Sequence, residues 1–199
     1  RQNQVRDAMI QVRKQTEVTG ASMDKEGWFV IAVKNGEPLR ARHLILTLGG
    51  IRNSIGASIA TKFGHRIQPA APSLFTFKIK DSRLEGLQGL SVQACRVHAA
   101  KGLEAEGPVL ITHWGLSGPA ILRVSAWGAR QLQEMDYHFE ISVNWCGNLQ
   151  EKDVNEKFNQ LRRTSPRQAI ANDPQFDLPS RLWRRLIECT EIGTDLRWP

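Results

Sequence analysis

The chain has 199 residues, of which 41% are hydrophobic and 24% charged, a composition usual for a folded domain with a core. No apolar run approaches the roughly 20 residues that a membrane-spanning helix needs, so no such helix is predicted. The net charge of +7 can indicate a polyanionic partner such as nucleic acid. A solvated basic surface is the favoured explanation, because no basic run reaches the roughly five residues of a dedicated nucleic-acid arm.

Cysteine and histidine residues form no metal-binding pattern. Cys95, Cys146 and Cys189 are far apart and lack Cys-x-x-Cys spacing, and the five histidines are equally scattered, so no metal site is expected. Three unpaired thiols favour a reducing compartment, and we expect a cytoplasmic protein without membrane association. Because Arg1–Val12 has neither an initiator Met nor a leader pattern, the sequence suggests an internal fragment.

The first third of the chain alternates helical and strand patterns. Apolar residues at helical spacing predict a helix over Gln4–Val18, and the aromatic and β-branched run in Gly27–Val33 predicts a strand. Asn35-Gly36 then predicts a tight hairpin turn, because both residues tolerate a positive φ. Leu44–Leu48 has the continuous apolar character of a strand buried on both faces, and Ser54–Phe63 predicts a helix that stops at Gly64.

The middle of the chain predicts a small β-barrel or sandwich, since short strand patterns recur between glycines. These patterns cover Leu74–Lys80, Gln88–His98, Gly107–Thr112 and Tyr137–Trp145. A helix over Pro119–Leu132 interrupts them, with Ser117 or Gly118 as its cap.

The last 50 residues predict two helices, Lys152–Arg162 and Leu178–Glu188, joined by a Pro- and Asn-rich segment. Leucines repeat every four residues in the second helix, and its arginines occupy other faces.

Two glycine-containing segments are candidate sites. Gly49 and Gly50 end an apolar strand pattern, where a bare backbone can approach a ligand closely. In the second segment a strand leads through His113 and Trp114 into Gly115–Pro119, where a helix begins and presents unpaired backbone N–H groups. A structural role explains the first segment equally well, because a buried strand can end in glycine. For the second segment the residues alone favour a structural role, with Ser117 as a helix cap and His113 as a hydrogen-bonded strand residue. A nucleophile elbow is not favoured, because Pro119 replaces its final glycine.

Taken together, these segments resemble a bacterial flavoprotein family known as YhiN- or BaiN-like, also described as HI0933-like or aminoacetone-oxidase-like. Leu46–Gly50 resembles the family's flavin loop, and Phe63–Ile67 with Pro69–Leu74 resembles its Leu-Gly-His and Pro-Ala-Leu segment. The most distinctive match is Ile111–Leu122, Ile-Thr-His-Trp-Gly-Leu-Ser-Gly-Pro-Ala-Ile-Leu.

The resemblance implies an α+β protein: part of a doubly wound flavin-binding domain with an insert made of a small β-barrel and a helical subdomain. The expected boundaries are 1–72 for the partial flavin domain, 73–149 for the barrel and 150–199 for the helical part. Two family features are missing from this sequence. The Gly-x-Gly-x-x-Gly fingerprint is absent, and only Ile51–Ala57 stands where the family has a longer run. We therefore expect no cofactor on this chain alone.

The resemblance implies an FAD-dependent oxidoreductase as the parent protein, with a small-molecule substrate and with NAD(P)H as a candidate co-substrate. Gly49 and Gly50 would approach the flavin. His113, Trp114, Gly115, Ser117 and Gly118 would face the substrate, with His113 and Ser117 as catalytic candidates. The isolated fragment would be inactive.

The alternative is a basic nucleic-acid- or ribosome-associated binding module without catalysis. It rests on the net charge, the barrel pattern and the arginines of the two C-terminal helices, Arg162-Arg163 and Arg181–Arg185. Solvated helix faces explain those arginines equally, so a nucleic-acid partner is not the first expectation. A lid or a dimer surface is a third possibility, and the sequence indicates no oligomeric state.

Overall fold

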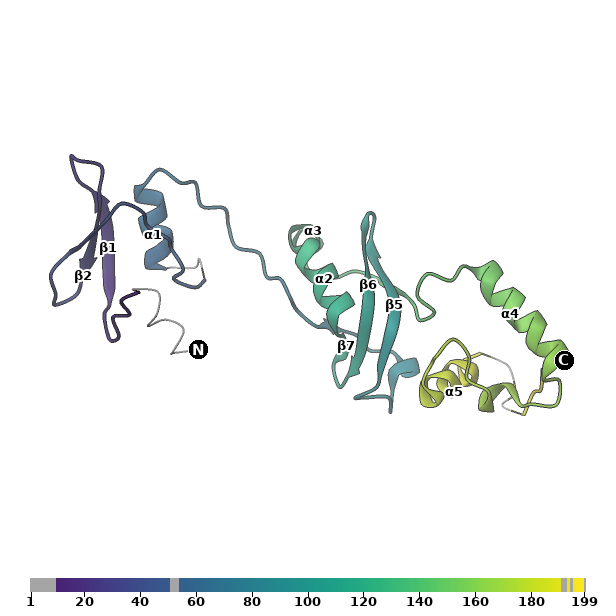
Figure 1. Cartoon of the computed structure of the whole chain (residues 1–199). Coiled ribbons are helices and arrows are strands. Elements are labelled where there is room, and N and C mark those ends of the chain that lie inside the picture. Colours follow the sequence, from purple (N-terminus) through teal and green to yellow (C-terminus); the bar gives the residue numbers. More distant parts are fainter. Residues whose placement is uncertain (1–9, 51–53, 191–192, 194, 199) are drawn as a thin grey trace. The chain divides into compact units, whose positions relative to one another are not determined.

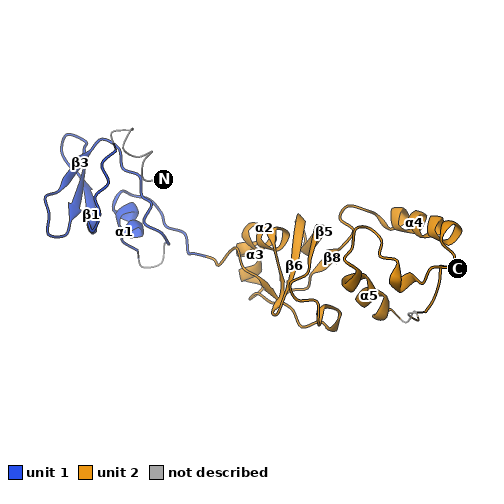
Figure 2. Ribbon diagram, turned by 60° about the horizontal axis from the view of Figure 1, so that its bottom comes forward, with its two compact units in different colours: residues 1–70 blue, residues 71–199 orange. Residues whose placement is uncertain are grey.

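The computed structural model of the chain describes residues 10–50, 54–190, 193 and 195–198. The chain divides into two compact units, Arg1–Ala70 and Ala71–Pro199 (Figure 2). Each unit is described by itself below.

Unit 1 contains a three-stranded antiparallel sheet and one helix (Figure 1). The strands are β1 (Val18–Met23), β2 (Phe29–Val33) and β3 (Leu39–Ala41), in the order β1-β2-β3. β2 and β3 form the predicted hairpin, but residues 34–38 connect them in place of a tight turn, with Asn35 at a φ of +57° and Gly36 not at a positive φ. Helix α1 (Ile55–Lys62) lies within the predicted range Ser54–Phe63, and the Ser54 side chain caps it by accepting a hydrogen bond from the Ala57 backbone N–H.

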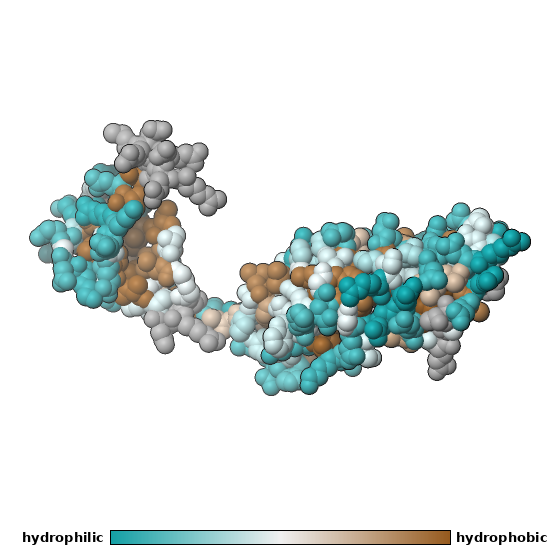
Figure 3. All heavy atoms as spheres, turned by 90° about the horizontal axis from the view of Figure 1, so that it is seen from below, coloured by the Kyte–Doolittle hydropathy of each residue, from teal (hydrophilic) through white to brown (hydrophobic). Residues whose placement is uncertain are grey.

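Two predicted elements of unit 1 are wrong. Ile10–Glu17, the described part of the helix expected over Gln4–Val18, is not helical, and Val18 already belongs to β1. Pairing of β1 with β2 outweighs the helical spacing of a few apolar residues. Leu44–Leu48 is not a strand, because no described residue pairs with its backbone. Ile45 of this segment is 84% exposed and Leu48 is 44% exposed. Figure 3 shows apolar residues, drawn brown, on the surface of unit 1.

Unit 2 is built on a five-stranded antiparallel sheet. The strands are β4 (Phe77–Lys78), β5 (Ser91–Ala100), β6 (Leu103–Thr112), β7 (Gly115–Ser117) and β8 (Ser142–Asn144). Their order is β4-β7-β6-β5-β8, so β4 and β8 are the two edge strands. All four strand patterns expected here contain strands, and β6 and β7 form the additional hairpin that sequence reasoning treated as a loop.

Helices surround the sheet of unit 2. They are α2 (Pro119–Trp127), α3 (Ala129–Glu134), α4 (Glu151–Thr164) and α5 (Ser180–Glu188), with short 3-10 turns η1 (Ser82–Leu84) and η2 (Ile170–Asn172). The single helix expected over Pro119–Leu132 is interrupted at Gly128. Both C-terminal helices lie where their apolar spacing predicts them.

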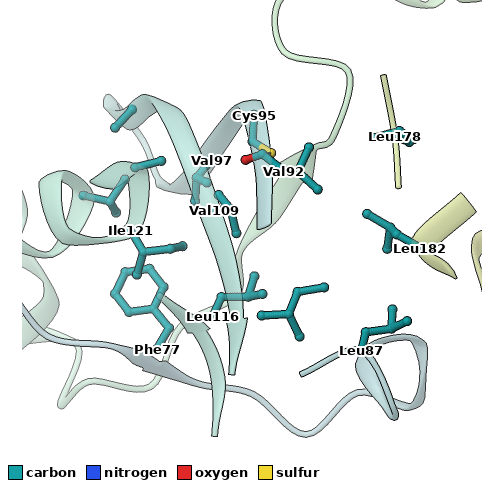
Figure 4. Packing of buried hydrophobic residues seen from close by; sticks show 14 of the residues in the cluster. Phe77, Leu87, Val92, Cys95, Val97, Val109, Leu116, Ile121, Leu178 and Leu182 are labelled. Carbon is teal, nitrogen blue, oxygen red and sulfur yellow. The ribbon is translucent and has the colours of Figure 1, made fainter. Parts of the chain in front are cut away.

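One hydrophobic core joins the sheet to the C-terminal helices. Val97, Val109 and Ile121 are fully buried between β5, β6 and α2, and Leu178 and Leu182 reach the same cluster from the C-terminal segment (Figure 4). Trp183 is also buried, and its indole N–H donates to the Ile170 carbonyl at 2.6 Å. The helical part is therefore packed onto the barrel strands and shares their core.

The three cysteines should differ sharply in reactivity. Burial raises the pKa of the Cys95 thiol to about 11, and burial also raises the pKa of Cys146, whereas Cys189 is exposed. Because the thiolate is the reactive form, iodoacetamide at pH 8 should alkylate Cys189 first and leave Cys95 unmodified in the native protein. Peptide mass spectrometry measures the order. Alkylation in urea is the control and should modify all three; rapid native labelling of Cys95 would contradict the packing.

Candidate substrate groove

Unit 2 contains a groove of about 970 Å³. One wall is β4 with its flanking residues, and the other is residues 139–143, which lead into β8. Leu116 of β7 and Leu182 and Leu186 of α5 complete the lining. The groove therefore touches both edge strands of the same sheet.

The groove exists because the curled sheet does not close on itself. Among the described residues, no strand pairing joins β4 to β8. The backbone N–H of Ile79 donates to the carbonyl of Trp114 at 2.9 Å, on the side of β4 that faces β7. Alternate residues of a strand direct their backbone groups to opposite edges, so the groups of Lys78 and Lys80 point to the edge that borders the groove. The groove is therefore open between the edges of β4 and β8.

Aromatic side chains line much of the groove. They are Phe75, Phe77, Tyr137, Phe139 and Trp145. Phe77 and Phe139 come from opposite walls and meet edge to face, with ring centroids 5.1 Å apart. Tyr137 contacts Phe75 in the same way at 5.7 Å and remains 37% exposed. These edge-to-face contacts hold the two walls together and leave apolar ring surface facing the groove.

Cations border the β4 wall. Lys78 and Lys80 are exposed, and neither forms an ion pair within the part of the chain that the structure describes. Arg83 instead pairs with Asp81, with Nη2 2.6 Å from Oδ2. These hydrogen bonds from Arg83 hold the pKa of the Asp81 carboxyl below its ordinary value. At neutral pH Asp81 therefore offsets Arg83, and the two lysines remain available, with Glu140 on the opposite wall.

The predicted substrate loop is a strand hairpin. His113 and Trp114 form its two-residue turn, and Trp114 is 70% exposed. Gly115 and Ser117 belong to β7, and the hydroxyl of Ser117 lies 3.3 Å from that of Thr76. Ser117 does not cap α2; Gly118 occupies the cap position without a side-chain bond. Since Ile79 of the groove bonds to Trp114, the hairpin tip lies at one end of the β4 wall.

The two glycines of this segment have packing roles. Gly115 has a φ of +140°, and a Cβ placed there would lie 2.4 Å from the Phe77 carbonyl oxygen and 2.5 Å from the Ile79 nitrogen. Gly118 has a φ of +99°, and its Cβ would lie 2.8 Å from the Pro108 carbonyl oxygen. Only glycine lets β7 lie this close to β4 at Gly115, and lets the start of α2 lie this close to β6 at Gly118. The most distinctive segment of the sequence thus builds the sheet that carries the groove.

Comparison with known proteins identifies the family. The sequence pattern of the family described as HI0933-like protein barrel and H2TH domain matches residues 71–198. This chain belongs to the HI0933-like family. The resemblance inferred from the sequence segments is thereby confirmed at the level of the family, and the HI0933-like pattern covers nearly all of unit 2, including the groove.

Two curated relatives are both named ribosomal RNA dihydrouridine synthase. The protein from Escherichia coli (strain K12) is 29% identical over 192 residues, which cover 92% of this chain and 45% of the relative. The protein from Haemophilus influenzae is 30% identical over 174 residues, covering 83% of this chain and 40% of the relative. The HI0933-like chain described here therefore spans less than half the length of these relatives.

Gly49 and Gly50 lie outside the region matched by the HI0933-like pattern, on an exposed segment of unit 1. A Cβ added to either glycine would meet no atom within 4 Å. The described residues around them therefore form no cradle that fits a flavin ring, and a cofactor role for the pair stays a prediction. Groups of three His, Cys, Asp or Glu suited to a metal, and helices long and apolar enough to cross a membrane, are both absent from the described residues.

Sequence reasoning missed the groove although a signal for it was present. Phe75 and Phe77 are two residues apart in one predicted strand, and Tyr137 and Phe139 are two apart in another. Spacing of two puts each pair on one face of its segment. Sequence patterns do not say that these faces meet, because this depends on how the sheet curls and on the positions of β4 and β8 in the strand order.

Proposed function

We propose that this chain is the RNA-binding, substrate-side part of a flavin-dependent oxidoreductase that modifies ribosomal RNA. The observation that carries the proposal is the apolar, aromatic-lined groove of unit 2 with free lysines on one wall. The name of the two relatives, ribosomal RNA dihydrouridine synthase, supports RNA as the substrate class, and they match 92% and 83% of this chain.

The groove has the chemistry that an unpaired RNA base requires. A base removed from its stack has two apolar faces and polar edges, and proteins bind such bases on aromatic side chains. Tyr137 and Trp145 supply ring surface, and no described aromatic ring stacks on Trp145. Lys78 and Lys80 lie where their ammonium groups can contact the phosphates that flank the base. His113 and Trp114 extend the site from the hairpin tip.

We assign no step of the redox chemistry to this chain. The relatives' name implies reduction of the C5–C6 double bond of a uridine, which takes up two electrons and two protons. FAD is the cofactor proposed for the parent protein, with NAD(P)H as a candidate source of electrons. Residues 1–72 would form part of its doubly wound flavin-binding domain. The role proposed for residues 73–199 is to bind and orient the RNA.

Nucleoside analysis of ribosomal RNA tests this function in the organism that carries the gene. Deleting the gene should remove dihydrouridine from one ribosomal RNA, as measured by mass spectrometry of digested nucleosides. Full-length protein should restore the modification, and Lys78→Gln with Lys80→Gln should restore it less completely, because two phosphate contacts are lost. Lys101→Gln with Lys152→Gln is the matched control, since both lysines are exposed and distant in sequence from the groove.

An unchanged dihydrouridine content after deletion would contradict the proposed function. A non-catalytic RNA-binding module is the second candidate, and one observation favours it: residues 1–70 contain eleven Lys and Arg against five Asp and Glu. This alternative predicts RNA binding by the protein with no loss of any modified nucleoside on deletion. The two outcomes are distinguishable in the same strain.

A further inference from the structure

The arginines of the last 50 residues fall into two classes. Arg162 of α4 has a local partner, because it donates to the side-chain oxygen of Asn159 at 2.8 Å. Those of α5 are engaged within the fold: Arg181 donates to the Gly86 carbonyl, Arg184 donates to the Asn172 side-chain oxygen at 2.7 Å, and Arg185 pairs with Glu188 at 3.7 Å. Their guanidinium groups therefore have structural roles. This removes most of the basic cluster that the sequence suggests for α5.

A second set of arginines has no such partner. Arg163, Arg167 and Arg197 are exposed, and their side chains form no hydrogen bond or ion pair with any described residue. Arg163 lies in the last turn of α4, and Arg167 follows three residues after that helix ends. Arg197 is brought to this segment by the chain itself, because it forms an antiparallel bridge with Ala169, two residues after Arg167. We call these three residues the arginine face.

The backbone beneath the arginine face is fixed by tertiary contacts. Ala169 and Arg197 form an antiparallel bridge, and the N–H of Ile170 donates to the Leu196 carbonyl at 2.9 Å. Trp198, next to Arg197, is only 4% exposed, and its indole N–H donates to Asp173 at 2.9 Å. The backbone that carries Arg167 and Arg197 is thus already ordered, so binding a ligand orders only the side chains.

Acidic residues do little to neutralise this face. The carboxylates of α4, which are Glu151, Asp153 and Glu156, lie in its first two turns, at the opposite end from Arg163. Asp195 is the nearest acidic residue in sequence to Arg197. Unit 2 as a whole is close to neutral, with 16 Lys and Arg against 15 Asp and Glu. The three unpaired arginines therefore form a locally basic surface on a unit that is nearly neutral overall.

The helix dipole explains part of this pattern. A basic side chain in the last turn of a helix is stabilised by the partial negative charge of the exposed carbonyl groups, which accounts for Arg163. Arg167 and Arg197 lie outside any helix, so the dipole gives no reason for their presence. Guanidinium groups that present a fork of N–H donors recognise phosphate oxygens, and a row of them matches a polyanion.

We infer that the arginine face binds backbone phosphates of the RNA, at a site separate from the aromatic groove. The inference rests on the proposed function, because it takes RNA as the partner. It assigns the groove to an unpaired base and the arginine face to the flanking RNA helix or strand. Phosphate contacts carry no sequence information, so this face supplies affinity and orientation.

The experiment compares binding of a fluorescent RNA hairpin by three versions of the full chain. These are the unmodified chain, the variant Arg167→Gln with Arg197→Gln, and the control Lys101→Gln with Lys152→Gln, which removes the same charge elsewhere in unit 2. Dissociation constants are measured by fluorescence anisotropy from 50 to 300 mM KCl. Thermal unfolding of each variant checks that the fold is intact.

We expect the arginine variant to bind about tenfold more weakly at 50 mM KCl. The slope of log affinity against log salt should fall in magnitude by roughly 1.4–1.8, because each of the two lost phosphate contacts removes about 0.7–0.9. Adding Arg163→Gln should lower the slope again. The lysine control should keep a slope within about 0.5 of the unmodified chain.

Two results would overturn the inference and have different meanings. If the unmodified chain binds RNA and the arginine and lysine variants lose equal affinity, the arginine face has no special role, and the proposed function is unaffected. If the unmodified chain binds no RNA at 50 mM KCl, both the arginine face and the RNA-binding role of this chain are wrong.

Discussion

Gly115→Ala should destabilise unit 2 by about 3 kcal/mol or more, the largest effect that we expect from adding a single methyl group. The φ of +140° is strained for any residue with a Cβ, which costs of order 1–3 kcal/mol. The new Cβ would also overlap the Phe77 carbonyl oxygen and the Ile79 nitrogen, and both are backbone atoms that cannot rotate away. Relief requires β4 to move off β7, which would break the wall of the groove.

Urea unfolding followed by tryptophan fluorescence measures this loss. Gly102→Ala is the matched control: Gly102 has a φ of +73°, but a Cβ there meets nothing within 4 Å. It therefore reports backbone strain alone, with an expected cost of about 1 kcal/mol. Equal losses for the two variants would contradict the close approach of β4 to Gly115.

Leu182→Ala should cost about 2–5 kcal/mol, because it leaves a cavity at a fully buried position of α5. Leu182 belongs to the cluster that also contains Val92 and Leu87, so its removal weakens the contact between the helical part and the sheet (Figure 4). It also removes one side chain from the lining of the groove. RNA affinity should therefore fall together with stability.

The shape of the unfolding curve adds a second measurement for Leu182→Ala. Since the sheet and the C-terminal helices share one core, the transition of unit 2 should remain a single step at a lower urea concentration. Leu149→Ala is the control, because that leucine is 39% exposed and should lose less than about 1 kcal/mol. A separate early transition of the helical part would show that its packing onto the sheet is weak.

Local signals in the sequence were sufficient for elements that depend on near neighbours. The predicted helix over Ser54–Phe63 contains α1, Asn35 takes a positive φ between β2 and β3, and the apolar spacing of α5 places Leu182 in the core. In each case the stabilising contact lies within a few residues or follows directly from the periodicity. These elements could be predicted because local preference and tertiary structure agree.

Elements that depend on distant partners could not be predicted. Leu44–Leu48 has the composition of a buried strand, yet a strand requires neighbours that accept its hydrogen bonds, and no described residue does so. The groove depends on Phe77 meeting Phe139, which is 62 residues further along the chain. The arginine face depends on a bridge between Ala169 and Arg197. Family resemblance identified the distinctive segment, but only the structure showed that its glycines serve packing.

The open edges of β4 and β8 also affect how the protein behaves in concentrated solution. An unpaired strand edge can recruit the edge of another molecule, and natural proteins discourage this with short edge strands and lysines. Here β4 has only two residues, of which one is Lys78, and Lys80 follows shortly after it. The two lysines therefore act as gatekeepers against aggregation as well as candidate phosphate contacts. Replacing them with apolar residues would promote aggregation of the purified protein. Glutamine is therefore the appropriate substitution, because it removes the charge and stays polar.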